Sequence, residues 1–286
     1  MKILVTGSNG QLGNEIRMRA GDHPGYEFLF TDLAELDITD EDAIESMIAS
    51  KKIRTIINCA AYTAVDKAEQ EEAMAYLINA TAVGNLARVA ARHGALLIHI
   101  STDYVYDGKG YRPYLEDDEP GPVSVYAKSK LWGEEEIQSC DCKALIIRTS
   151  WLYSAFGGNF VKTIMKLGKE KGEARVISDQ VGTPTYAGDL AEAIMYIIDN
   201  QPAPQGFEIF NYSNEGVASW YDFAKAIIEF SGISCKITPI ETKEFLLPAA
   251  RPFYSVFNKS KIKNRYQLVI PYWRDSLKSC IERMGG

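Results

Sequence analysis

A tyrosine and a lysine four residues apart, Tyr126 and Lys130, are the side chains of this sequence best suited to acid–base chemistry. At that spacing both side chains share one face of a helix. A phenol ordinarily keeps its proton at neutral pH, but a neighbouring ammonium group favours the phenolate and so assists proton transfer. The pair therefore indicates a proton-transfer centre, although the same pattern also fits two side chains on a helix surface.

A hydroxyl group stands upstream of this pair. Ser101 ends the segment 95–101, whose short apolar run is typical of a buried β-strand, and Thr102 follows it. Either hydroxyl could hydrogen-bond the carbonyl oxygen that a tyrosine protonates. The residues alone leave the choice between Ser101 and Thr102 open.

A glycine-rich turn follows the apolar segment 2–5 at the N-terminus. Glycines let the backbone turn tightly and approach a phosphate, and the helix expected over 11–20 would present free N–H groups at its start. This order predicts a dinucleotide site with the spacing GxxGxxG, although glycine also marks ordinary turns. The residues concerned are Gly7, Asn9, Gly10, Gln11, Leu12 and Gly13.

Acidic residues follow the second strand-like segment, 27–31. Asp32 is placed to accept hydrogen bonds from the adenosine ribose, and Asp37 and Ile38 are close enough to hold the adenine side. Solvated loop carboxylates would give the same pattern. Because no arginine or lysine adjoins Asp32, nothing favours a 2′-phosphate, and both NADPH and NADH remain candidate cofactors.

Apolar strand-like segments alternate with helical patterns through the first half of the chain. One helical pattern runs without a break from Ala64 to His93 and ends at Gly94. The alternation predicts an α/β fold, a Rossmann-type doubly wound parallel sheet with a smaller C-terminal substrate-binding lobe. The strand-like segments are 27–31, 54–60, 95–101 and 143–150.

The regular alternation ends near residue 150. We expect residues 1–150 to form an NAD(P)-binding domain and residues 151–286 mainly a substrate-binding lobe, with segments near 187–213 returning to the sheet. The patterns behind this expectation are strands at 174–178 and 207–213 and helices near 158–170, 188–200 and 219–231.

The composition excludes several classes of protein. The net charge of −7 offers no basic field for nucleic acid or for an anionic membrane. No segment approaches the roughly 18 apolar residues of a membrane span, and the N-terminal apolar run is too short for a signal peptide. The five cysteines are scattered, and Cys140 and Cys142 stand too close for a zinc or redox pair. Reduced thiols and a cytoplasmic protein are therefore expected.

Together the motifs resemble extended short-chain dehydrogenases/reductases, and among them the dTDP-4-dehydrorhamnose reductase family. The resemblance runs to about residue 255, and the segments 65–69 and 179–185 distinguish it from sugar-nucleotide epimerases of the same fold. It implies reduction of the C4 keto group of dTDP-4-dehydro-L-rhamnose to dTDP-L-rhamnose by NADPH or NADH. The segments that carry it are 7–13, 58–69, 101–108, 179–185 and 250–252.

The resemblance also implies roles for individual residues. Tyr126 protonates the C4 oxygen, Lys130 lowers the pKa of Tyr126 and binds the nicotinamide ribose, and Thr102 orients the carbonyl. Arg251 is suited to a nucleotide diphosphate because a guanidinium pairs with it in a bidentate way. Other residues implied to line the cofactor are Ala60, Ala61 and Tyr62, and those implied to contact the substrate are Thr102, Asp103, Trp151, Asn159, Gln180 and Thr183.

Alternatives stay open. A reductase or epimerase acting on a related nucleotide-deoxysugar, or a non-catalytic regulatory relative, would share the fold. Trp151 could equally be an ordinary core residue. Glu15 and Glu192 stand where some family members hold Mg²⁺ at a dimer interface, but lone helical glutamates are commonly solvated, so no metal site is predicted. We expect a monomer or a homodimer.

Overall fold

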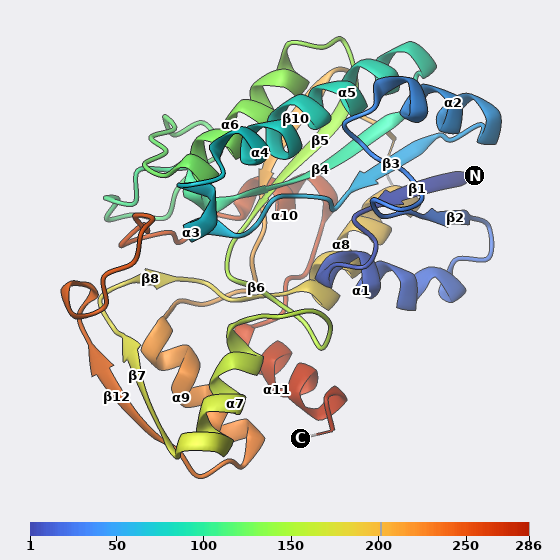
Figure 1. Cartoon of the computed structure of the whole chain (residues 1–286). Coiled ribbons are helices and arrows are strands. Elements are labelled where there is room, and N and C mark those ends of the chain that lie inside the picture. Colours follow the sequence, from blue (N-terminus) through green and yellow to red (C-terminus); the bar gives the residue numbers. More distant parts are fainter. Residues whose placement is uncertain (201, 286) are drawn as a thin grey trace.

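A six-stranded parallel β-sheet forms the centre of the computed structural model, which describes residues 1–200 and 202–285 (Figure 1). Its strand order is β10-β5-β4-β3-β1-β2. The order reverses between β1 and β3, as it does in a doubly wound sheet, so the predicted fold class is confirmed. The strands are β1 (Lys2–Thr6), β2 (Glu27–Phe30), β3 (Thr55–Asn58), β4 (Leu96–Thr102), β5 (Lys143–Thr149) and β10 (Phe207–Asn211).

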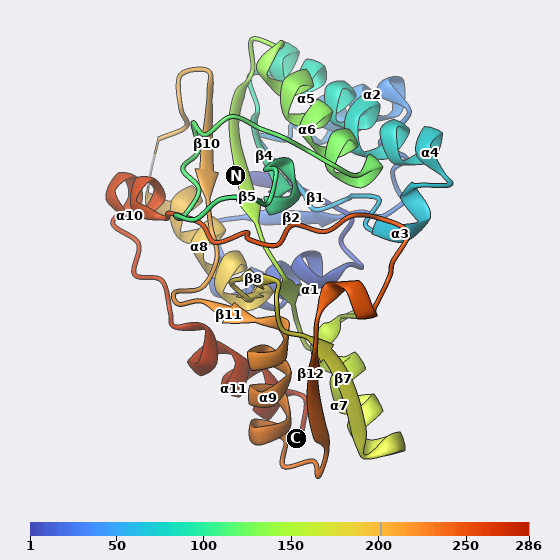
Figure 2. The same ribbon diagram turned by 90° about the vertical axis from the view of Figure 1, so that its left-hand side faces the viewer.

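Helices cover both faces of this sheet (Figure 2). Ile3 and Val5 of β1 belong to the apolar cluster on one face, whereas Leu4 belongs to the cluster on the other. Because successive strand residues point to opposite faces, a sheet covered on both sides requires apolar residues at nearly every position. One face carries α1 (Gln11–Arg19), α8 (Ala187–Asn200) and α10 (Ser260–Tyr266), and the other α2 (Glu41–Lys51), α5 (Ala82–His93) and α6 (Val125–Gln138).

The single helix predicted from Ala64 to His93 is wrong. The segment contains α3 (Val65–Ala68), α4 (Glu72–Tyr76), the π-helical turn η2 (Leu77–Thr81) and then α5. The carbonyl oxygen of Asn79 in η2 lies so close to Gly133 of α6 that a Cβ at position 133 would stand 2.1 Å from it. The helix is broken at residues 69–71, and the π-helical turn within the continuous stretch 72–93 packs closely against α6, which hydrophobic periodicity does not reveal.

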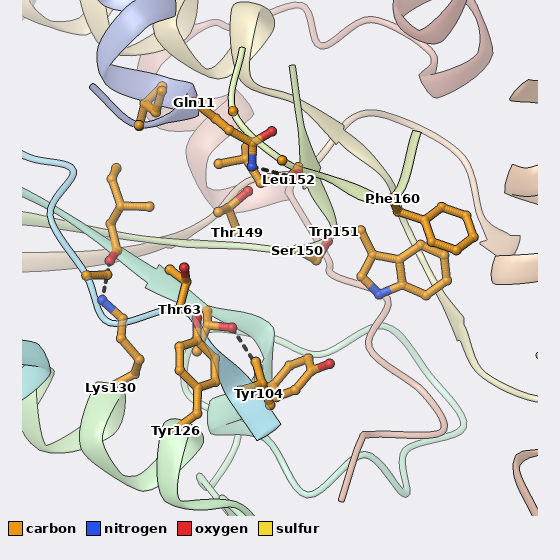
Figure 3. Close-up of a pocket in the computed structure, with 18 of the residues that line it drawn as sticks. Gln11, Thr63, Tyr104, Tyr126, Lys130, Thr149, Ser150, Trp151, Leu152 and Phe160 are labelled. Carbon is orange, nitrogen blue, oxygen red and sulfur yellow. Dashed lines mark hydrogen bonds between the residues drawn. The ribbon is translucent and has the colours of Figure 1, made fainter. Parts of the chain in front are cut away.

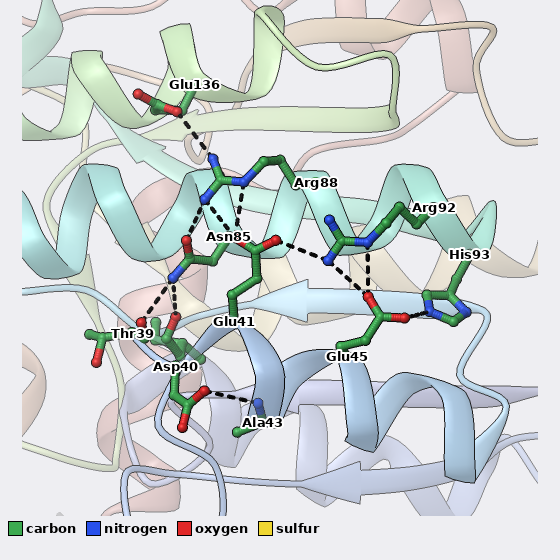
Figure 4. Close-up of polar contacts among 11 residues, drawn as sticks. Thr39, Asp40, Glu41, Ala43, Glu45, Asn85, Arg88, Arg92, His93 and Glu136 are labelled. Atoms are coloured by element: carbon green, nitrogen blue, oxygen red, sulfur yellow. Dashed lines mark hydrogen bonds and ion pairs between the residues drawn. The ribbon is translucent and has the colours of Figure 1, made fainter.

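A polar network on the surface joins α2 to α5 (Figure 4). Asp40 caps α2 by accepting a hydrogen bond from the Ala43 amide at 3.0 Å. Arg92 of α5 lies 2.9 Å from a carboxylate oxygen of Glu41 and 2.8 Å from one of Glu45. These side chains are partly exposed, so the network fastens two helices at the rim of the sheet without entering the core.

The C-terminal part of the chain has an apolar cluster of its own, which includes Phe223 and Leu277. Its largest elements are α7 (Phe160–Lys171), β7 (Glu173–Ile177), α9 (Trp220–Ser231), β12 (Lys236–Ile240) and α11 (Trp273–Arg283), with β12 parallel to β7 (Figure 1). Short strands pair as β6 (Leu152–Tyr153) with β9 (Thr185–Tyr186) and as β8 (Val181–Gly182) with β11 (Ala218–Ser219). The 3-10 turns are η1 (Ala20–Asp22), η3 (Asp103–Val105) and η4 (Thr242–Glu244).

A buried carboxylate connects α1 to this C-terminal part. Glu15 is fully buried, and its side chain accepts a hydrogen bond from the Ser154 hydroxyl at 2.7 Å. Arg19 and Arg283 also donate to it, at 3.2 and 2.7 Å. Glu15 is therefore occupied by protein partners, which neutralise its charge away from solvent.

Candidate active site

A cavity of about 1340 Å³ opens where β1, β3 and β4 end (Figure 3). Its wall combines the glycine turn, the start of α6 and residues of the C-terminal part. In doubly wound sheets, ligands bind at the carboxyl ends of strands beside the switch point, which is where this cavity lies. Predicted site residues on its wall are Gly7, Gly10, Gln11, Leu12, Asp32, Asp37, Ile38, Ala60, Ala61, Thr102, Asp103, Tyr126, Lys130, Trp151, Gln180 and Arg251.

The glycine turn fits a pyrophosphate. Gly7 has a φ of +60°, and a Cβ there would lie 2.6 Å from the Cα of Ala60. A Cβ on Gly13 would lie 2.5 Å from the Cα of Ser8. The helix α1 begins after Gly10 with no side chain capping it, so its first N–H groups are free to bind an anion.

The two predicted acidic residues hold the backbone beside the turn. Asp32 accepts hydrogen bonds from the amides of Asn9 at 3.1 Å and Leu33 at 2.9 Å. Asp37 accepts one from the Thr39 hydroxyl at 2.7 Å, which lowers the pKa of its carboxyl. Both carboxylates therefore shape the loop as well as line the cavity.

A residue that the sequence did not single out fixes the far end of this loop. Asn85 of α5 is buried, and its side-chain amide donates to the carbonyl oxygens of Ile38 at 3.3 Å and Thr39 at 3.0 Å. Its own oxygen accepts from Arg88, which also reaches Glu41 (Figure 4). The surface network of α2 and α5 thus extends to the cavity wall.

Tyr126 and Lys130 extend from α6, which Ser124 caps (Figure 3). The Tyr126 ring packs edge-on against Tyr104, with ring centroids 5.7 Å apart. Burial raises the pKa of Tyr126 to about 12; the Thr102 hydroxyl opposes this shift and Asp103 adds to it. Lys130 is buried and donates to the carbonyl oxygen of Ile100 at 2.7 Å. Its burial lowers the pKa of Lys130 to about 8.

The expected lowering of the Tyr126 pKa by Lys130 is therefore not found in this structure. Removing the phenolate from water disfavours it, and this burial is the largest cause of the raised Tyr126 pKa. For both Tyr126 and Lys130, burial is the largest cause of the pKa shift, and in each case it favours the uncharged form.

The two candidate hydroxyls have different surroundings. Ser101 donates to Glu134 at 2.5 Å, and Glu134 is bound in turn by Arg148. Thr102 donates to the Asp103 carboxylate at 3.1 Å. Ser101 thus hydrogen-bonds a buried ion pair, whereas the Thr102 hydroxyl opposes the rise in the pKa of Tyr126.

Asp103 is an unusual carboxylate. It is buried, and among the described residues its second oxygen, Oδ2, has no hydrogen-bond partner. Burial raises the pKa of Asp103 to about 7, although the hydroxyls of Ser255 and Thr102 oppose the shift. Its protonation therefore changes near neutral pH, beside the cavity.

Three aromatic side chains form another part of the cavity wall. Trp151 has a φ of +47°, a left-handed conformation that is strained for a bulky residue. Its ring stacks on Trp220, with centroids 3.6 Å apart and planes within 9°. Phe160 lies against Trp220 at 4.6 Å, so three rings form one apolar surface.

Arg251 already has a partner. Its guanidinium bonds both carboxylate oxygens of Asp66, at 3.0 and 2.8 Å, and also reaches the carbonyl oxygen of Ala249. Gln180 is buried and donates to the Thr242 hydroxyl at 3.1 Å. Both residues line the cavity, but their polar groups are engaged within the protein.

Five predicted site residues do not line the cavity: Asn9 and Gly13 of the glycine turn, and three residues that each have a local structural task. The Tyr62 hydroxyl donates to Glu71, and its amide donates to Asn79. Asn159 caps α7 and donates to Gln11 at 3.0 Å. Thr183 is fully buried and donates to the carbonyl oxygen of Gly216. The hydrogen bonds of these three side chains are made within the protein, and Asn159 holds Gln11, which does line the cavity.

Several lining residues lay outside the predictions. They bear no recognisable spacing, because distant segments bring them together: Thr63, Phe160, Arg175, Trp220, Phe245 and Leu247. Within residues 1–200 and 202–285, no group of three or more His, Cys, Asp or Glu residues could hold a metal ion. The same residues contain no helix with the length and hydropathy of a membrane span.

Comparison with known proteins gives consistent results. A family described as RmlD substrate binding domain matches residues 1–285. The spore coat polysaccharide biosynthesis protein SpsK of Bacillus subtilis (strain 168) is 41% identical over 281 residues, which cover 98% of this chain and 97% of that protein.

Two solved structures extend the similarity to the whole fold. A dTDP-4-dehydrorhamnose reductase of Clostridium acetobutylicum ATCC 824 has a TM-score of 0.94 and 43% identity, covering 100% of both chains. A dTDP-4-dehydrorhamnose reductase of Bacillus anthracis str. Ames, solved in complex with NADP, has a TM-score of 0.93 and 37% identity, covering 99% of both.

Proposed function

This chain belongs to the RmlD substrate binding domain family, and we propose that it reduces the C4 keto group of dTDP-4-dehydro-L-rhamnose to give dTDP-L-rhamnose. The observation that carries this proposal is the meeting of Thr102, Tyr126 and Lys130 on the wall of the cavity that the glycine turn also lines. A nicotinamide cofactor supplies the hydride when bound.

We propose that the sheet region holds the cofactor. The free N–H groups at the start of α1 bind the pyrophosphate, and Asp32 with the loop at Asp37 receives the adenosine. Lys130 binds the nicotinamide ribose. We assign this task to residues 1–150 with the returning segment 187–213, and substrate binding to the remainder of 151–286.

In the proposed reaction Tyr126 gives its phenolic proton to the C4 oxygen as C4 receives the hydride, so a C=O bond becomes a C–OH. Thr102 turns its hydroxyl hydrogen from Asp103 to this oxygen and so holds it. The phenolate that forms is disfavoured by burial, so a protonated Lys130 next to it lowers the barrier. Proton and hydride together complete the reduction.

The nucleotide-sugar occupies the C-terminal side of the cavity in this proposal. Trp151 presents an apolar ring to the sugar, and Asp103 and Gln180 offer polar groups to it. Arg251 exchanges Asp66 for the diphosphate, because both present paired oxygens to a guanidinium. The free cysteine thiols fit a reducing compartment, and we propose that the protein acts in the cytoplasm.

The test mixes the purified protein with authentic dTDP-4-dehydro-L-rhamnose and either NADPH or NADH, and follows loss of reduced-cofactor absorbance. Tyr126→Phe should lower kcat by about 10²–10⁴-fold, because it removes the proton donor. Tyr111→Phe is the control, since Tyr111 is 94% exposed and lies outside the cavity. No oxidation by the wild-type protein would exclude the substrate, and full turnover by Tyr126→Phe would exclude the proton donor.

A further inference from the structure

We propose that His99 is a positioning residue that opposes protonation of Lys130: a buried chain of hydrogen bonds, running from Thr6 through Asn58, makes the Nε2–H group of His99 donate to the lysine nitrogen. The inference rests on the proposed function, because it gives a role to the lysine that acts with Tyr126. It adds a residue from the middle of β4 that does not line the cavity.

The orientation of the Asn58 side chain fixes the direction in which these hydrogen bonds donate. Its Oδ1 atom accepts from the Thr6 hydroxyl at 2.7 Å and from the Ala60 amide at 3.2 Å. A backbone N–H group can only donate, so the amide oxygen must face Ala60 and the amide nitrogen must face the other way. That nitrogen lies 3.0 Å from Nδ1 of His99 and donates to it.

The protonation of His99 then follows. His99 is fully buried, and its burial, with the charge of Lys130 adding to the effect, holds the pKa of its imidazole well below the usual range. A neutral imidazole carries one N–H group, and because Nδ1 accepts from Asn58, the hydrogen must be on Nε2. Nε2 lies 3.3 Å from the Lys130 nitrogen.

An ammonium group has three N–H donors and no lone pair, so it cannot accept from Nε2–H. A neutral amine can accept this hydrogen and still donate to the carbonyl oxygen of Ile100, 2.7 Å away. The contacts around Lys130 are thus satisfied in its neutral form and frustrated in its charged form. Asn58 and His99 are buried and do not leave the chain of hydrogen bonds open to solvent, whereas Thr6 and Lys130, also buried, stand at the cavity wall.

Other titratable groups near Lys130 do not set this direction. Glu134, one turn further along α6, favours the ammonium, but its carboxylate is bonded by Arg148 of β5. Burial raises the pKa of the Cys59 thiol, next to Asn58, to about 12, so it is uncharged. Asp103 of η3 and Tyr126 of α6 stand on the cavity side. A lysine with its two forms close in energy can take up and release protons near neutral pH.

The first experiment reads the tautomer of His99 directly. The protein has three histidines, so ¹⁵N-labelled imidazole spectra of wild type and His99→Gln identify the signal of His99. We expect a neutral ring protonated on Nε2 that does not titrate while the protein stays folded. A ring protonated on Nδ1, or an imidazolium, would overturn the inference. This readout needs no turnover, so it stands apart from success or failure of the proposed reaction.

The second experiment reverses the direction of the hydrogen bonds between residue 58, His99 and Lys130. In Asn58→Asp, a carboxylate of the same shape accepts from Nδ1–H, so the lone pair on Nε2 faces Lys130 and favours its ammonium form. We expect the Nδ1–H tautomer, and a basic limb of the kcat/KM profile moved up by on the order of one pH unit. Asn58→Ala is the uncharged control: it frees the ring to choose its tautomer and should move the limb in the same direction by less.

A purely structural role for Asn58 would lower stability or kcat without moving the limb or the tautomer. If both variants keep the wild-type tautomer and pH profile, the inference is wrong. If Asn58→Asp alone moves the limb and the tautomer stays on Nε2, the added charge is responsible and the inference is equally wrong.

Discussion

Two arginine–glutamate contacts in this protein have similar lengths and very different surroundings. Arg148 lies 2.6 Å from Glu134 beneath the cavity, where the side chains are 2% and 0% exposed. Arg92 lies 2.9 Å from Glu41 on the rim, where they are 48% and 32% exposed (Figure 4). Arg148 bonds Glu134 through two of its nitrogens, whereas Arg92 divides its contacts between Glu41 and Glu45, so the pairs differ in geometry as well as in exposure.

The histidines repeat the contrast. His99 is enclosed by Asn58 and Lys130, and burial keeps it neutral. His93 contacts Glu45 at the surface, where water can replace either partner. Buried polar groups have no substitute for a lost partner, whereas exposed ones do. The comparison teaches that exposure, more than distance, identifies the polar residues on which structure and chemistry depend.

The largest effect should come from breaking the buried pair. Glu134→Gln keeps the shape but leaves the Arg148 charge buried without a counter-ion. We expect the free energy of unfolding to fall by about 3–5 kcal/mol. Denaturant unfolding at neutral pH measures it, and a loss as small as that of a surface pair would show that burial does not govern the contrast.

A smaller effect on the free energy of unfolding should appear when the carboxyl group of Asp103 is removed. Because burial raises the pKa of Asp103 to about 7 from 3.8, the folded protein keeps a proton there after the unfolded chain has lost it. The contribution of this group to the free energy of unfolding is therefore complete at low pH and is lost as the pH rises through 7.

Asp103→Asn abolishes that loss. Relative to wild type, its free energy of unfolding should rise by up to about 4 kcal/mol between acidic pH and a pH above the folded pKa. Unfolding curves across the pH range provide the measurement. A difference between the two proteins that stays constant with pH would mean that Asp103 ionises normally.

Asn85 links the surface network of α2 and α5 to the cavity wall. We therefore expect its replacement to have an effect between those at the buried groups and at the surface pair. Asn85→Ala removes the hydrogen bonds to the backbone of Ile38 and Thr39. We expect the KM for the nicotinamide cofactor to rise about fivefold with little change in kcat, from a loss of roughly 1 kcal/mol. Arg92→Ala, on the same helix but away from the loop, should leave KM unchanged; equal effects would deny Asn85 a positioning role.

The smallest effect belongs to the rim. Arg92→Ala should change the free energy of unfolding by about 0.5 kcal/mol or less, and added salt should remove most of the difference. The comparison with Glu134→Gln is then made between two arginine–glutamate contacts of nearly equal length. A loss of several kcal/mol at Arg92 would contradict the role given to solvent.

The sequence predicted those features whose signals are local. Gly7 with its turn, the strands, and Tyr126 with Lys130 are all patterns of neighbouring residues, and they lie where expected. The close packing of Asn79 could not be predicted, because its neighbour Gly133 is more than fifty residues away along the chain. Likewise, a threonine such as Thr183 suits a position in the cavity wall and a position behind it equally well. Only the fold shows that Thr183 lies behind the wall.

His99 shows the limit most clearly. In the sequence it is a single polar residue within an apolar strand, and its neighbours Asn58 and Lys130 come from other elements. Burial and hydrogen-bond direction, which set the preferred protonation of both His99 and Lys130, exist only once β3, β4 and α6 are packed together.

The stacked rings of Trp151 and Trp220 give the protein a built-in optical signal. Two indoles in such contact share their excited states, so the pair should produce a split circular-dichroism band that isolated tryptophans lack. The chain has four tryptophans, and this pair lines the cavity. Binding of any ligand that separates the rings would therefore change this band, so binding could be measured without a label and without turnover.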